Sequence, residues 1–124
     1  MNDAANVTEQ IIGAAIEVHR ALGPGLLESA YTECLAMELE LRGMPFRREI
    51  SLPVTYKGRQ VDCSYRLDLL VAESVVVEVK SVRVLESIHE AQLMTYMKIG
   101  GWGLGLLINF NVPALKNGVR RRIL

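Results

Sequence analysis

The stretch "DLLVAESVVVEVKSV", residues 68–82, decides how this chain is built. It predicts two apolar β-strands joined by a short turn at Ala72-Glu73-Ser74, because runs of valine and leucine favour strands and small polar residues favour turns. Three charges interrupt the apolar pattern. Asp68 begins the first strand, and Glu78 and Lys80 lie inside the second. Charges among residues that should be buried need an explanation.

Strand periodicity places these charges relative to one another. Glu78 and Lys80 share one face of their strand with Val76, because alternate residues point to the same side. Asp68, on the preceding antiparallel strand, faces the same way if the register of the turn allows. Two carboxylates and an ammonium on an apolar face are costly unless they are paired or bind something. Mg²⁺ or Mn²⁺ would fit, because such ions prefer carboxylate oxygen and can also meet a substrate phosphate.

The alternative is that these charges lie on a solvated sheet face and discourage edge-to-edge pairing. The spacing D-x₉-E-x-K, taken alone, does not separate a metal site from a solvated face.

Working outward, helical periodicity predicts three helices. The first is capped by Asn6 or Thr8 and ends before "GPG" at residues 23–25, the second runs from about 27 to 42, and the third from about 86 to 99. Strand patterns fill the remainder, in the segments "REISLPVTY", "QVDCSYRLDLLV", "VVVEVKSV", "LGLLINF" and "GVRRRIL". The order ααβββαβ(β) indicates one α/β (α+β) domain over residues 1–124, with a sheet covered by helices.

Composition narrows the function classes. Fourteen basic residues balance fourteen acidic ones, so any surface for nucleic acid must be a local patch. The opening "MNDAANVTEQ" lacks the basic and apolar segments of a leader, and the longest apolar runs are too short to span a bilayer. We therefore expect a cytoplasmic protein without membrane contact.

Two further pairs of polar residues lie on helix faces. Glu28 and Tyr31 are three residues apart at the start of the second helix, where an acidic residue also suits the helix dipole. Gln92 and Tyr96 are four apart on the third helix, and both offer hydrogen bonds. Tyr96 could equally be a core aromatic with its hydroxyl at the rim.

Taken together, these motifs resemble the GxxExxY family, a branch of the PD-(D/E)XK nuclease superfamily. The likeness runs from about Ile11 to Ile123, and it rests on the segments "GLLESAY", "YRLDLLV", "VVVEVKS", "EAQLMTYMK" and "LGLLINF". The resemblance implies a restriction-endonuclease-like fold, in which a mixed β-sheet is flanked by helices. It also implies a site that hydrolyses phosphodiester bonds with Mg²⁺ or Mn²⁺.

The resemblance assigns roles by position. Asp68 and Glu78 match the metal-binding carboxylates, Lys80 matches the catalytic lysine, and Glu28 matches a helix carboxylate that completes the metal site. Gln92 and Tyr96 match an element that supports the site or contacts nucleic acid. Tyr31 belongs to the motif that names the family, and we expect it to support the site or to contact nucleic acid.

The expected function is therefore hydrolysis of nucleic acid by a metal-activated water with assistance from Lys80. DNA is favoured over RNA as the substrate. The alternative is a non-catalytic subunit that binds nucleic acid or protein and keeps the nuclease fold. Because the chain has no room for a substantial recognition domain, a homodimer or a partner protein is compatible with either function.

Overall fold

The computed structural model describes residues 4–124, except for the side chains of Cys63 and Ser64. Its elements follow the predicted order, so the expectation of a mixed sheet covered by helices is confirmed. They are α1 (Ala4–Leu22), α2 (Glu28–Leu41), β1 (Phe46–Tyr56), β2 (Arg59–Val71), β3 (Val75–Lys80), α3 (Ser87–Gly100), β4 (Leu104–Asn109), the 3₁₀ turn η1 (Leu115–Gly118) and β5 (Val119–Ile123).

One five-stranded sheet carries the strands in the order β1-β2-β3-β4-β5. All neighbours are antiparallel except β3 and β4, which are parallel and are connected through α3. Parallel neighbours need such a crossover, because a tight turn cannot return the chain to the same end of the sheet. β3 is buried from Val75 to Val79, as expected for a central strand with both faces covered.

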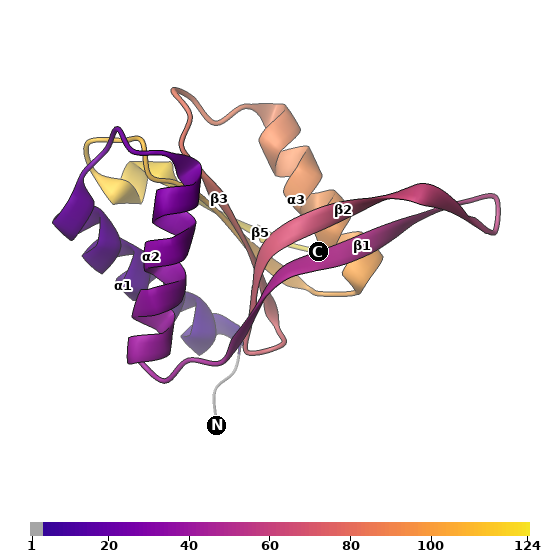
Figure 1. The fold of residues 1–124 in the computed structure, drawn as a ribbon, viewed down its shortest axis with the longest axis horizontal. Coiled ribbons are helices and arrows are strands. Elements are labelled where there is room, and N and C mark those ends of the chain that lie inside the picture. The colour runs from indigo at the N-terminus through magenta and orange to yellow at the C-terminus, as the bar shows by residue number, and fades with distance from the viewer. Residues whose placement is uncertain (1–3) are drawn as a thin grey trace.

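The two faces of the sheet carry separate cores (Figure 1). α1 and α2 cover one face and pack on Val75, Val77 and Val79. α3 covers the other face and packs on Val76. The predicted alternation of β3 is therefore confirmed, and it directs Glu78 and Lys80 toward the α3 side of the sheet.

The two strands of the β1–β2 hairpin are much longer than the other strands of the sheet. The hairpin extends away from the body of the protein (Figure 1). Its base packs under α3 through Leu52 and Leu67. Its outer end turns at Lys57-Gly58, and residues 53–62 there are exposed or half-exposed. The predicted hairpin turn is confirmed, although Arg59 already belongs to β2.

Helix boundaries agree with the sequence except at the first cap. Neither Asn6 nor Thr8 caps α1, because the helix already includes Ala4 and Thr8 lies buried inside it. The Thr8 hydroxyl instead donates to the Ala4 carbonyl, 2.7 Å away. α3 begins with a reciprocal cap in which the Glu86 backbone N–H donates to His89 Nδ1 at 2.9 Å.

Candidate metal and nucleic-acid site

The site begins where the β2–β3 ladder stops. The ladder pairs Val71 with Val75, Leu70 with Val76 and Leu69 with Val77. Continued by one residue, this register sets Asp68 opposite Glu78. The sequence expectation that the register would bring the two carboxylates to the same place is therefore confirmed.

At this point side chains replace the backbone bonds of the ladder. The Asp68 carboxylate accepts a hydrogen bond from the Val79 backbone N–H at 2.8 Å. In return, the Glu78 carboxylate accepts one from the Asp68 backbone N–H at 3.1 Å. Each carboxylate is thus fixed by the backbone of the other strand. Such bonds hold the remaining oxygen of each carboxylate in a defined direction.

Glu78 is deeply buried, with 4% of its surface exposed. Burial raises the pKa of its carboxyl to about 10, and the adjacent Asp68 carboxylate adds to the rise. Lys80 acts in the opposite direction, with a smaller effect. The protein alone therefore leaves this pair of acids short of positive charge. A divalent cation would supply that charge, so the donor set fits a metal ion such as Mg²⁺ or Mn²⁺.

Lys80, Gln92 and Tyr96 complete the cluster. The Lys80 ammonium donates to Gln92 Oε1 at 3.4 Å, which links the end of β3 to α3. Tyr96 is 4% exposed. Burial raises the pKa of its phenol to about 12, with further contributions from Glu78 and Asp68. The structure therefore brings together five of the seven residues selected from the sequence.

Glu28 lies at the edge of this cluster rather than inside it. It is exposed in the first turn of α2 and shares a cleft of about 190 Å³ with Asp68. Among the described residues, no three His, Cys, Asp or Glu side chains are grouped closely enough to hold a metal ion. Asp68 and Glu78 thus lie inside the cluster, and Glu28 lies at its edge.

The same cleft contains Arg48 and Glu49, which the sequence did not assign to the site. Arg48 pairs with Glu33, which raises the pKa of its guanidinium, and its Nε is buried without a hydrogen-bond partner. Glu49 has a φ of 51°, a conformation that non-glycine residues adopt rarely. The β1–β2 register sets Glu49 opposite Asp68, so both neighbouring strands depart from regular pairing there.

Tyr31 lies apart from the charged cluster. It is fully buried and its ring stacks on Phe110, with 4.6 Å between centroids. Its hydroxyl donates to the Gly23 carbonyl at 2.6 Å and accepts from the Leu26 backbone N–H at 3.1 Å. Direct contact with nucleic acid is therefore excluded for Tyr31. Its observed contacts fix the loop that leads into Glu28.

Two further residues lie near the site, and neither was predicted from the sequence to belong to it. His89 caps α3 and lines a pocket. Tyr65, on β2, faces the same pocket, and its ring centroid lies 5.7 Å from that of Tyr96. Tyr65 reaches this pocket because the long hairpin packs against α3. No local sequence pattern could have predicted that contact.

Comparison with known proteins gives one finding. A family model described as the PD-(D/E)XK nuclease superfamily matches residues 5–122. Searches of curated proteins and of solved structures returned no match. In the described part of the chain, each helix is too short or too polar to cross a membrane.

Proposed function

Because the chain belongs to the PD-(D/E)XK nuclease superfamily, we propose that it is a metal-dependent nuclease of the GxxExxY branch. It hydrolyses phosphodiester bonds of nucleic acid and uses Mg²⁺ or Mn²⁺. The observation that supports the proposal is the pair of hydrogen bonds across the β2–β3 junction, in which Glu78 accepts from the Asp68 backbone N–H and Asp68 accepts from the Val79 backbone N–H. A structural ion pair would need no second carboxylate beside the buried Glu78.

Asp68 and Glu78 are the proposed metal ligands. Mg²⁺ is commonly held by one or two protein carboxylates together with waters and substrate phosphate, so two inner carboxylates are sufficient. When bound, the ion supplies Lewis acidity and a water of lowered pKa. Glu28 lines the same cleft as Asp68, and its proposed role is to assist in holding the ion, directly or through a water.

Lys80 is the proposed positioning and charge-stabilising group. Its ammonium follows Glu78 on the same face of β3 and is oriented by its hydrogen bond to Gln92. In this position it can orient the attacking water and offset the negative charge that grows on the phosphoryl oxygens. Gln92 supports Lys80, and Tyr96 closes the apolar side of the site. No group in this scheme forms a covalent bond with the substrate.

The test is cleavage of labelled DNA and RNA, each single- and double-stranded, in Mg²⁺ or Mn²⁺. Wild type is compared with Lys80→Ala, with an EDTA control and with Lys98→Ala, which removes the same charge from an exposed position on α3. We expect cleavage by wild type and Lys98→Ala, and none by Lys80→Ala or with EDTA.

Circular dichroism verifies that each variant is folded. Folded wild-type protein that binds the metal but cuts no member of the panel would overturn the proposal and favour a non-catalytic binding subunit. Full cleavage by Lys80→Ala would refute the role of the lysine.

A further inference from the structure

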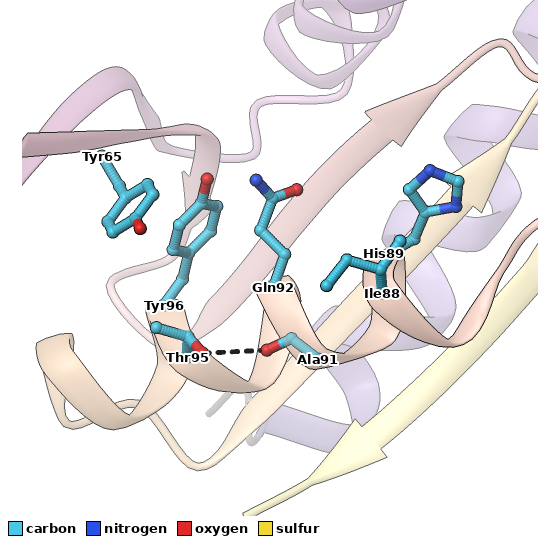
Figure 2. A pocket seen from close by; sticks show the side chains of 7 residues that line it. All are labelled: Tyr65, Ile88, His89, Ala91, Gln92, Thr95 and Tyr96. Atoms are coloured by element: carbon cyan, nitrogen blue, oxygen red, sulfur yellow. Dashed lines mark hydrogen bonds between the residues drawn. The ribbon is translucent and has the colours of Figure 1, made fainter.

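A pocket of about 330 Å³ lies between the base of the β1–β2 hairpin and α3. Figure 2 shows Tyr96, Gln92 and His89 rising from α3 on one side, with Tyr65 reaching toward them from β2. The lining residues are Tyr65, Ile88, His89, Ala91, Gln92, Thr95 and Tyr96. A volume near the lower end of the range for small-ligand pockets fits one flat ring system.

The walls of the pocket are apolar and aromatic. Tyr96 is buried, whereas Tyr65 keeps 45% of its surface exposed. Their rings meet at an interplanar angle of 48°, so the two phenols do not stack on each other and the exposed part of the Tyr65 ring stays accessible. Ile88 is 66% exposed at the other end of the pocket. Aromatic rings left open in this way are suited to stacking a planar ligand.

Polar groups stand at the edge of the pocket that faces the metal site. Gln92 Oε1 accepts from Lys80, and the amide nitrogen of the same side chain carries two donor hydrogens. His89 uses Nδ1 for the helix cap, which leaves Nε2 as its other polar atom. A ligand in the pocket would therefore contact Gln92, which is bonded to Lys80, and Tyr96, whose phenol is affected by the charges of Glu78 and Asp68.

We propose that this pocket binds one unpaired nucleobase of the substrate, stacked on Tyr65, next to the phosphate that is cleaved. The inference rests on the proposed nuclease function and adds the class of substrate, a single strand or an unpaired end. Bases can stack on aromatic side chains only when they have left the duplex. Stacking tolerates any base, because every base has a π-face, so the pocket imposes no strict sequence requirement.

The test is a binding cycle that separates bases from phosphates. An end-labelled single strand of twelve thymidines is compared with a twelve-residue abasic strand of equal charge, by fluorescence anisotropy in Ca²⁺ at fixed salt. Wild type, Tyr65→Phe, Tyr65→Ala and Tyr56→Ala are titrated with both. Tyr56 is the matched control, because it is an exposed tyrosine of the same hairpin that does not line the pocket.

Wild type should bind the thymidine strand roughly tenfold more tightly than the abasic strand, as expected for one stacked base. Tyr65→Phe and Tyr56→Ala should keep this preference, and Tyr65→Ala should lose most of it. A twelve-base-pair duplex should bind wild type and Tyr65→Ala equally. The proposal is overturned if wild type has no preference or binds neither strand, if Tyr65→Ala retains the preference, or if Tyr65→Ala weakens duplex binding as much as strand binding.

The binding cycle tests the base pocket, whereas the cleavage panel tests the nuclease function, so the two proposals can fail separately. Cleavage without a Tyr65-dependent preference for bases would refute the base pocket and support the nuclease function. A Tyr65-dependent preference for bases, with no cleavage under any condition, would refute the nuclease function and support a base-binding pocket.

Discussion

The buried carboxylate of Glu78 makes a sharp prediction about stability in the absence of metal. Its pKa is about 10 in the folded protein, against 4.5 for an unperturbed glutamate. Between these values the folded state holds a proton that the unfolded state has released. Stability is therefore highest near the lower value and falls as the pH rises, by about 1.4 kcal/mol for each pH unit.

The size of the effect follows from that slope. From pH 5 to pH 7, the free energy of unfolding of metal-free wild type should fall by roughly 3 kcal/mol from this group alone. Glu78→Gln keeps an oxygen that can accept from the Asp68 backbone N–H but cannot ionise. Near pH 5 the two proteins should be similar, and at pH 7 the glutamine variant should be more stable by about 3 kcal/mol.

Urea denaturation in EDTA, followed by the fluorescence of Trp102, the single tryptophan, measures this difference. Glu40→Gln, at an exposed position on α2, is the matched control and should follow wild type. Adding Mn²⁺ at pH 7 should stabilise wild type and not Glu78→Gln, because a bound cation favours the ionised form of the Glu78 carboxyl. If Glu78→Gln has the pH slope of wild type, or is the less stable protein at pH 7, the electrostatic reasoning is wrong.

Three other outcomes test the surrounding structure. Glu28→Gln should slow single-turnover cleavage much less than Asp68→Asn, because Glu28 is exposed at the rim; equal losses would place it in the inner site. Tyr31→Phe removes two hydrogen bonds and should lower the free energy of unfolding, measured in urea, by about 1–2 kcal/mol. An unchanged midpoint would show that these bonds to the loop do not stabilise the fold. Arg121 is exposed on the edge strand β5, between Arg120 and Arg122, where a phosphate can approach it. Arg121→Ala should therefore reduce the salt dependence of binding by about one phosphate contact, and an unchanged slope would show that the nucleic acid does not contact this edge.

The sequence predicted those parts of the fold that depend on local periodicity. Alternation in β3 was sufficient to assign Glu78 and Lys80 to one face. A shift of one residue in a strand that is buried on both sides would move every side chain to the opposite face, so the pattern is strongly specified. The lengths of α2 and α3 followed from the same kind of pattern, with errors of about one residue at each end.

What escaped prediction depends on contacts between distant segments. The bonds from the Asp68 backbone to Glu78 and from the Val79 backbone to Asp68 require the regular ladder to end at Leu69, and no local residue pattern predicts that end. The pattern around Glu49 looks like an ordinary strand, although its backbone takes a left-handed conformation. Pairings of this kind are set by the packing of whole elements, so they appear only in three dimensions.

The long hairpin has a mechanical consequence. Its strands of 11 and 13 residues span about 36–43 Å at 3.3 Å per residue, yet a ladder of three residue pairs, about 10 Å long, attaches β2 to β3. A second attachment lies on the tip side of Asp68, where Leu52 and Leu67 pack against α3. The segment that carries Asp68 is therefore held at both ends, by the ladder to β3 and by the contact with α3. Only the part of the hairpin beyond this second attachment is free to bend, so the spacing between Asp68 and Glu78 is insulated from what the hairpin tip touches.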